Sequence, residues 1–229
     1  MKRSTFYLYL VIAGLLLVSV TACRNEMSSE KAIFSLKEGN YWNFHGKYNN
    51  KTVFLRMEVL RVLTEGRLTF AVIKGFPTDV MEGEDWEPSV WGLLSVGNTH
   101  YYKVTGARTD SIDKWLSNKE SIHSELVTDS DLFIESLYHT GQTFGEAGQL
   151  TRDDGNYFWS VTGKKACEPS SIRGLKLAGP FDQYTLSYRT IADETMIDVV
   201  PGIGIVRYRY LHHGTSEDLD MKLAEAGIK

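Results

Sequence analysis

Two cysteines, Cys23 and Cys167, are the side chains of this sequence best suited to forming covalent bonds. A cysteine thiol accepts a lipid, binds a metal or attacks an electrophile, depending on its neighbours. Cys23 follows the small residues Thr21 and Ala22, whereas Cys167 comes shortly after a pair of lysines, which can lower a thiol pKa. We expect Cys167 to be an unreactive loop thiol. With two cysteines in all, a disulfide-stapled scaffold is excluded.

Carboxylates gather between residues 76 and 89, where proline and glycine break the surrounding pattern and predict a long loop. Around Trp86 this loop holds Asp79, Glu82, Glu84, Asp85 and Glu87. Carboxylates bind hard cations, but this spacing does not match the Asp-x-Asp-x-Asp-Gly pattern of a calcium loop. We expect a solvated acidic loop without metal. Trp86 either packs back on the domain, as we expect, or marks a contact surface for a partner.

The rest of the sequence carries no strong catalytic or cofactor signature. It lacks the Gly-x-Ser-x-Gly, His-Glu-x-x-His and nucleotide-binding patterns. The segment Pro201-Gly202-Ile203-Gly204 lacks the Lys-Ser/Thr of a phosphate loop and favours a type II turn. His212 and His213 are adjacent, so they point to opposite faces of a strand and make a poor metal site. We therefore expect a protein that is not an enzyme and that uses no cofactor and no metal.

The first 22 residues have the features of an export signal. Lys2 and Arg3 form a short basic region, and a mostly apolar run follows from Phe6 to Val20. At about 15 residues this run is shorter than the ~20 that a membrane-spanning helix needs. The sequence predicts export, and it does not predict an integral membrane protein.

The segment Val20-Thr21-Ala22-Cys23 resembles the lipobox of bacterial lipoproteins. In that family the cysteine thiol receives diacylglycerol, the signal is cut before the cysteine, and the new amine is usually acylated, for example by palmitate. The resemblance implies that Cys23 is the lipidated first residue of a protein anchored to the bacterial cell membrane or outer membrane, outside the cytoplasm. Since Arg24 and not Asp follows, the family's sorting habit implies the outer membrane in a host with two. The alternative is an ordinary signal peptide.

Charge and length describe the part of the chain after this signal. The signal holds two of the 25 basic residues and none of the 29 acidic ones, which leaves a net charge of 23 minus 29, or −6. Mild acidity without a basic patch argues against nucleic acid as a partner. Residues 23–33 are mostly polar and predict a flexible tether, and residues 34–229 predict a single β-rich domain.

Alternating apolar and polar residues predict strands through most of this domain. In the clearest case, Val53, Leu55, Met57 and Val59 share one face of a long strand. Turn residues such as Asn49-Asn50 separate the segments. The expected strands cover residues 41–48, 52–64, 68–74, 89–94, 100–104, 132–138, 155–163, 184–189, 203–210 and 219–223.

One helix is expected among these strands. Asp110 is a suitable capping residue, and apolar residues from Ile112 to Leu126 lie roughly on one side of a helix. A single helix in a β-domain commonly covers an open sheet face. We therefore predict a mainly β fold, a curved antiparallel sheet or half-barrel with one covering helix.

Three motifs taken together resemble a group of uncharacterised bacterial lipoproteins. They are Leu36-Lys37-Glu38-Gly39-Asn40-Tyr41-Trp42, Leu177-Ala178-Gly179-Pro180-Phe181 and Val200-Pro201-Gly202-Ile203-Gly204-Ile205-Val206. The sequence departs from the group's pattern at Ser35, Leu177, Pro180 and Val200. In that group the motifs look like turns that launch strands, and no catalytic residue comes with them. The resemblance implies a curved sheet or half-barrel similar to the periplasmic carriers of lipoproteins.

Aromatic residues are plentiful in the expected strands and helix, and we take four of them as candidate ligand-binding residues: Trp42, Trp91, Trp115 and Trp159. If the sheet closes on the helix, these rings form a dry core. If a gap remains, they line an apolar pocket of the kind that takes small molecules. We expect the concave face to bind a hydrophobic or lipid-like ligand. The alternative is an envelope interaction or structural protein whose partner contacts the acidic Trp86 loop and the sheet edges.

Overall fold

The computed structural model describes residues 32–82, 86–104, 127–136, 138–167, 172–175 and 180–229. Its contacts divide the chain into two units, Met1–Glu30 and Lys31–Lys229. The second unit holds all twelve strands of one antiparallel sheet and both apolar clusters, so we expect it to fold by itself. The predicted mainly β fold is confirmed.

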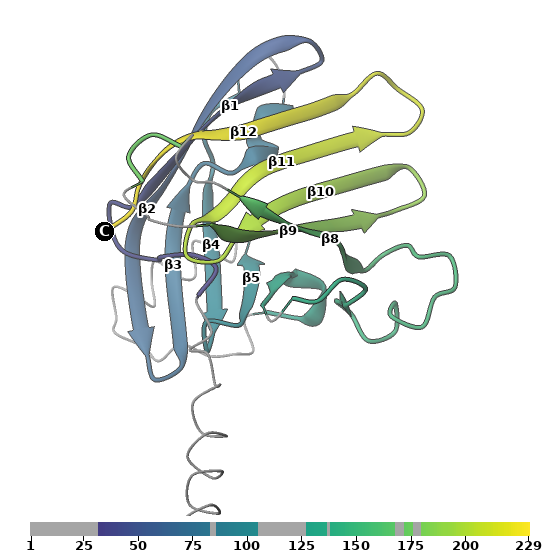
Figure 1. The fold of residues 1–229 in the computed structure, drawn as a ribbon, viewed down its shortest axis with the longest axis horizontal. Coiled ribbons are helices and arrows are strands. Elements are labelled where there is room, and N and C mark those ends of the chain that lie inside the picture. The colour runs from purple at the N-terminus through teal and green to yellow at the C-terminus, as the bar shows by residue number, and fades with distance from the viewer. Residues whose placement is uncertain (1–31, 83–85, 105–126, 137, 168–171, 176–179) are drawn as a thin grey trace, which may run out of the picture. The chain divides into compact units, whose positions relative to one another are not determined.

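The strands follow one another in the sheet in the order β6-β5-β4-β3-β2-β1-β12-β11-β10-β9-β8-β7 (Figure 1). Their bounds are β1 Tyr41–Tyr48, β2 Lys51–Glu65, β3 Leu68–Lys74, β4 Val90–Val96, β5 His100–Val104, β6 Leu132–Glu135, β7 Thr143–Phe144, β8 Trp159–Cys167, β9 Phe181–Arg189, β10 Asp193–Val200, β11 Gly204–His212 and β12 Asp218–Gly227. Strands that pair in the sheet are consecutive in the chain, except that β1 pairs with β12. Two meanders therefore meet at the first and last strands.

The turns between these strands have the backbone that their residues favour. Asn49 and Asn50 both have positive φ, 48° and 67°, as the two-residue turn of a hairpin requires. At the predicted type II turn, the amide of Ile203 donates to the carbonyl of Val200 at 2.9 Å, and Gly202 has φ 86°. The turn predictions at these two places are confirmed.

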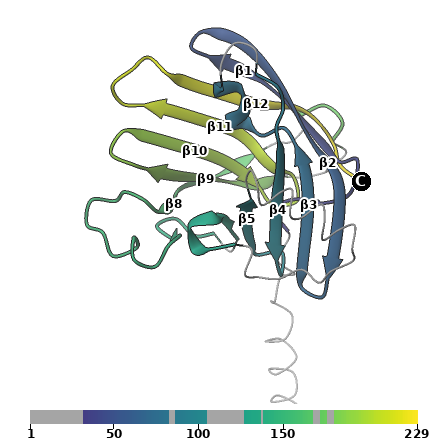
Figure 2. The ribbon, with the colours of Figure 1, turned by 180° about the vertical axis from the view of Figure 1, so that it is seen from behind.

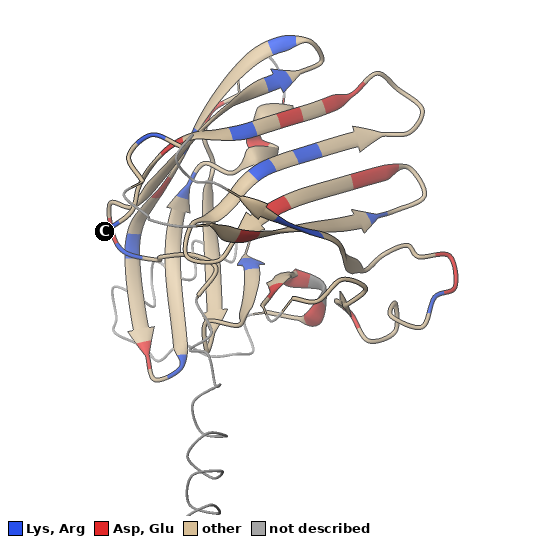
Figure 3. Cartoon of the chain, in the orientation of Figure 1, with Lys and Arg blue, Asp and Glu red and all other residues tan. Residues whose placement is uncertain are grey.

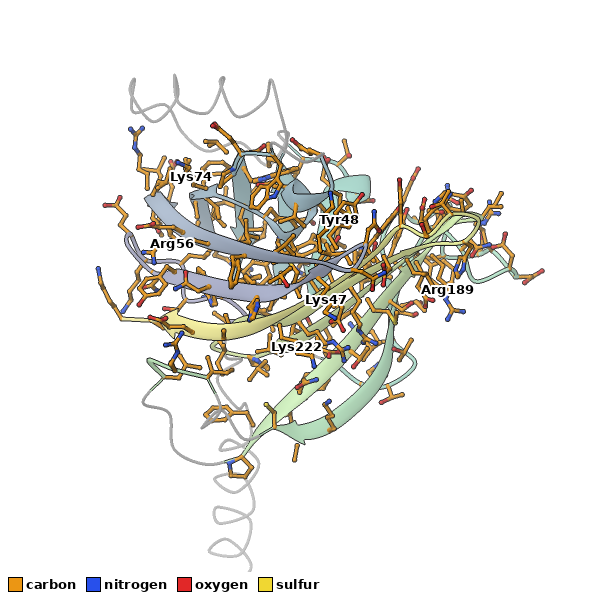
Figure 4. All side chains as sticks on the ribbon, turned by 90° about the horizontal axis from the view of Figure 1, so that it is seen from above. Lys47, Tyr48, Arg56, Lys74, Arg189 and Lys222 are labelled. Carbon is orange, nitrogen blue, oxygen red and sulfur yellow. The ribbon has the colours of Figure 1, made fainter. Side chains whose placement is uncertain are left out.

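The sheet is strongly curved, and its inner face holds the main apolar core (Figure 2). Side chains from both meanders fill much of the space inside the curve (Figure 4). Fully buried members come from β1, β5, β9, β10 and β12: Trp42, Tyr101, Leu186, Ile197 and Met221. Of the two alternatives considered from the sequence, a dry core or an apolar pocket, the dry core describes much of the concave face.

The outer face differs between the two meanders. Phe70, Val72, Leu94 and Val104 form a second buried apolar cluster on the outer face of β3, β4 and β5, with Val127 packed against it. Basic residues of β11 instead lie between acidic residues of β10 and β12 (Figure 3). There the Arg207 guanidinium donates to both oxygens of the Asp220 carboxylate at 2.7 and 2.6 Å. The expected helix, residues 112–126, lies outside the described ranges.

Helical structure in the described ranges consists of two 3₁₀ segments, η1 (Pro77–Met81) and η3 (Asp129–Asp131). No helix in that part of the chain is long and apolar enough to span a membrane. Several details of the strand prediction were wrong. Strand β10 was missed, β6 ends at Glu135 rather than residue 138, and β9 begins at Phe181 rather than residue 184. Strand β8 covers Trp159–Cys167 rather than residues 155–163, and it does not begin earlier because Tyr157 has φ 69° and cannot continue a strand.

Candidate functional site

A cavity of about 440 Å³ lies within the curve of the sheet, where strands of the two meanders face each other. Its walls come from β4, β5 and β6 on one side and from β8, β9, β10 and β11 on the other. Residues 145–157, between β7 and β8, contribute Gly145, Glu146, Gln149 and Tyr157. Strands alternate their side chains between two faces, and β4, β5, β8, β9, β10 and β11 each contribute one inward-facing residue to this space.

Six aromatic residues of the cavity wall form one connected set, which we call the aromatic cluster: Phe76, Trp91, Phe133, Trp159, Tyr188 and Tyr208. The Phe76 ring lies 5.7 Å from Trp91, 5.4 Å from Phe133 and 6.2 Å from Tyr208, between ring centroids. Trp159 in turn lies 5.9 Å from Phe133 and 5.3 Å from Tyr188. These distances are those of favourable aromatic pairs, so each ring is held in place by another.

One basic side chain, Lys103 of β5, lies among these rings. Its Nζ atom is 4.0 Å from the centroid of the Trp91 ring and 4.2 Å from that of Phe76. Burial lowers the pKa of Lys103 to about 8, while the nearby Asp79 carboxylate partly opposes this change. Cation–π contacts of this kind compensate in part for the lost hydration of the ammonium.

Asp79 holds the segment that supplies Phe76. Its side chain is fully buried. Oδ2 accepts hydrogen bonds from the amides of Phe76 and Ser89, both at 2.9 Å, and Oδ1 accepts one from the indole of Trp91 at 2.9 Å. The predicted solvated acidic loop was therefore wrong for this residue, which is a structural acceptor beneath the cavity wall.

The remaining polar groups of the cavity are three carboxyl groups, three phenols, the amide of Gln149 and the hydroxyl of Thr195. Asp129 and Asp131 come from η3, and Glu146 lies in the loop before β8. Oδ2 of Asp131 accepts from the Thr128 amide at 2.8 Å and from its hydroxyl at 3.1 Å. Burial raises the pKa of Tyr208 above its ordinary value, so this phenol stays protonated at neutral pH. In the described part of the chain, no three His, Cys, Asp or Glu side chains are grouped to hold a metal ion.

The predicted site residues take different places. Trp91 and Trp159 line the cavity. Trp42 lies in the core, where its indole donates to the carbonyl of Ile203 at 2.5 Å. Trp86 is partly buried and packs against the core. Cys23 and Trp115 lie outside the described ranges.

The contact between Trp42 and Ile203 joins two of the three motifs. The first motif turns at Gly39, with φ 76°, just before β1, and the third turns at Gly202 just before β11. Both are turns that launch strands, as the resemblance implied. Residues 177–179 of the second motif lie outside the described ranges.

Several cavity residues were missed in the sequence: Phe76, Lys103, Phe133, Tyr188 and Tyr208. One of them had a readable signal. In the expected strand 100–104, Lys103 shares a face with Tyr101, and a lysine beside a buried ring is unusual. Tyr102 and Val104 make the opposite face of this strand equally apolar, so the sequence did not show which face, and hence whether Lys103, points into the sheet's interior.

No protein-family model and no curated protein matches the chain. Two solved structures are similar to it. One is a protein from Bacteroides fragilis NCTC 9343, described as exported and as having a YmcC-like fold; it is 12% identical, with 86% of this chain and 99% of that chain covered and a TM-score of 0.46. The other is from Parabacteroides distasonis ATCC 8503 and is described as a lipoprotein; it is 9% identical, with 87% and 100% covered and a TM-score of 0.37. At these TM-scores the likenesses identify no site residue in this chain.

Proposed function

We propose that this protein is a lipid-anchored component of the bacterial cell envelope that holds a small hydrophobic ligand in the aromatic cavity, without catalysing a reaction. The observation that carries the proposal is the cavity itself, about 440 Å³ in volume and walled by the aromatic cluster. Small-molecule sites commonly have volumes of about 300–1,000 Å³, apolar aromatic walls and a few polar groups. Each of these features is present here.

The fixed positions of the rings support binding rather than simple packing. Every member of the aromatic cluster touches another member from a different strand or segment. Rings that are already held in place lose little conformational freedom when a ligand arrives, and this favours affinity. The lipobox at Val20-Thr21-Ala22-Cys23 supports the anchor, which would keep the protein close to a source of hydrophobic molecules.

Binding can be tested on residues 24–229, which include the whole sheet and lack the anchor. We expect native mass spectrometry to find a co-purified hydrophobic molecule, and a fluorescent fatty acid to bind and change the tryptophan emission. A bulky side chain at Thr195, which lines the cavity, should block binding. The matched control is Thr162→Trp, because Thr162 is exposed on β8. The proposal would be contradicted if the folded protein bound no hydrophobic probe, or if the Thr195 and Thr162 variants bound the probe equally well.

A second candidate function, contact with an envelope protein, is favoured by one surface feature. Phe54 is 66% exposed on β2 and stacks on His45 with 4.4 Å between ring centroids. Both line a groove of about 320 Å³ together with Arg56 and Arg173. A photo-crosslinking residue placed at Phe54 should capture one specific protein in cells, and the same residue at Thr162 should not.

A further inference from the structure

Lys103 brings a positive charge into a cavity whose wall includes the aromatic cluster. Among the described residues that line the cavity, it is the one basic side chain. It points from β5 to the inner face, beside the Trp91 ring of β4 and the Phe76 ring before η1. A hydrophobic site with no use for charge would be more stable with an apolar residue here.

The ammonium of Lys103 lacks a close anionic partner within the described residues. None of the ion pairs found between them includes Lys103. Asp79 is the acidic group that favours its charged form, yet both carboxylate oxygens of Asp79 already accept hydrogen bonds from nitrogen donors. The N–H groups of Lys103 are therefore available to a bound acceptor.

We propose that the ligand of the aromatic cavity is an amphiphile with a single acidic group, and that Lys103 binds this group while the rings contact the apolar part. This inference rests on the proposed function, and it adds the chemical class of the ligand. A carboxylate on the ammonium would form charge-assisted hydrogen bonds, which are about twice as strong as neutral ones. A free fatty acid is the simplest molecule with this chemistry.

The other charges of the cavity limit the ligand to one small anionic group. Asp129, Asp131 and Glu146 also line it, and they would repel a group with several negative charges. Asp131 is already engaged by Thr128. A monoanion bound at Lys103, with its apolar chain toward the rings, avoids most of this repulsion, whereas a multiply charged phosphate does not.

The charge of Lys103 makes binding dependent on pH. The titratable groups around it are Asp79 of η1, Asp129 and Asp131 of η3, Glu146 and Tyr157 of the loop before β8, Tyr188 of β9 and Tyr208 of β11. Burial raises the pKa of both Tyr188 and Tyr208 above 10, the ordinary value for tyrosine. Both phenols are therefore neutral at pH values below 10. Because the pKa of Lys103 is lowered to about 8, the free protein loses this charge above pH 8. Affinity for an anion should then fall about tenfold per pH unit.

The test compares decanoate with decanol, which share a chain and differ in charge. Both are titrated into residues 24–229 between pH 7 and 9.5 while tryptophan emission is followed. We expect decanoate to bind at least about tenfold more tightly at pH 7, and to lose this advantage as the pH rises. Decanol binding should not change with pH.

Two variants separate the role of Lys103 from a general loss of binding. Lys103→Met keeps the apolar stem and should abolish the preference for decanoate while leaving decanol binding intact. Lys164→Met is the matched control, since Lys164 also lies over an aromatic ring, that of Tyr184, but pairs with Asp182 outside the cavity lining. Equal binding of the two probes to the unmodified protein, or an unchanged preference in Lys103→Met, would overturn the assignment and leave the proposed function standing. If neither probe binds, both proposals fail.

Discussion

At the scale of single residues, Lys103 is a side chain whose charged form is disfavoured by burial in the fold. Its pKa is lowered from 10.5 to about 8, so the unfolded chain holds the proton more tightly than the folded one. Since one pKa unit corresponds to about 1.4 kcal/mol, the charged lysine costs on the order of 3 kcal/mol at neutral pH. This cost is fully present below pH 8 and fades as the pH rises toward 10.5.

We therefore expect Lys103→Met to be more stable than the unmodified protein at pH 7, by up to about 3 kcal/mol. The two proteins should approach each other between pH 8 and 10, because the unmodified protein gains stability as its lysine is deprotonated. Urea unfolding of both at a series of pH values measures the difference. A difference that stays constant with pH would show that Lys103 does not titrate in the cavity.

Asp79 should matter for stability far more than the solvated loop predicted from the sequence indicates. Replacing it by alanine leaves three N–H donors without an acceptor, those of Phe76, Ser89 and Trp91. Each buried unpaired donor costs about 1–3 kcal/mol, so Asp79→Ala should lose at least about 3 kcal/mol. Asp153→Ala, at an exposed residue, should change stability by less than about 0.5 kcal/mol. Urea unfolding compares them, and similar losses in both would be inconsistent with the buried network.

At the scale of elements, the turn before β11 is fixed by the chain that precedes β1. A Cβ atom at Gly204 would lie 2.6 Å from the ring of Phe34, and the residue has φ 100°. Gly202 has φ 86°, but a Cβ atom there meets nothing within 4 Å. The two glycines thus share the unfavourable backbone and differ in packing.

Gly204→Ala should consequently lose more stability than Gly202→Ala. Both variants carry the cost of a left-handed backbone, about 1–2 kcal/mol, and only Gly204→Ala must also move the Phe34 ring. We expect about 1–3 kcal/mol of additional loss in thermal or urea unfolding. Equal losses would mean that Phe34 moves aside without cost.

Element by element, the sequence predicted those strands whose two faces differ in polarity. The inward residues Leu55, Met57 and Val59 of β2 stood out because the charged residues Arg56 and Glu58 separate them. In β10, the first four residues are all partly buried, and the buried Asp198 accepts from Thr185 at 2.7 Å, so no clear alternation marked this strand. A polar residue satisfied by a neighbouring strand cannot be recognised before the pairing is known.

The cavity was harder to predict than the strands, because it depends on contacts between distant segments. Trp42 and Trp91 both lie on inward faces, but Trp42 meets the turn before β11, whereas Trp91 meets Phe76 and Lys103. Periodicity assigns a face to each ring and does not say what lies opposite. Whether a gap remains follows from pairs such as Phe76 with Tyr208, which join β11 to the segment before η1.

At the scale of the whole molecule, the resemblance of Val20-Thr21-Ala22-Cys23 to a lipobox predicts that Cys23 is the first residue of the mature protein and carries the lipid. Intact-mass analysis of protein extracted from membranes should show a chain that begins at Cys23 with added acyl groups. Cys23→Ser should leave uncleaved or soluble precursor, since the modified thiol is required before cleavage in the family that the segment resembles. A mature mass without acyl groups, or unchanged membrane retention of Cys23→Ser, would contradict the anchor.

The pairing of β1 with β12 also bears on how fast the chain folds. Tyr41 pairs with Gly227, and the Lys229 amide donates to the Asn40 side chain at 3.1 Å, so the end of the chain lies beside the start of β1. A circular permutant that links residue 229 to residue 32 and opens at the exposed His139 would run through all twelve strands in sheet order.

Every strand pair of that permutant would be a local hairpin, and its relative contact order would fall. Because folding rates of small domains rise as contact order falls, we expect the permutant to refold faster than the natural order in stopped-flow experiments, from the same denatured state. An unchanged rate would mean that the joining of the two meanders comes after the slowest step. In the natural chain, the pairing of β1 with β12 at the centre of the sheet is the strand pairing that closes the longest loop.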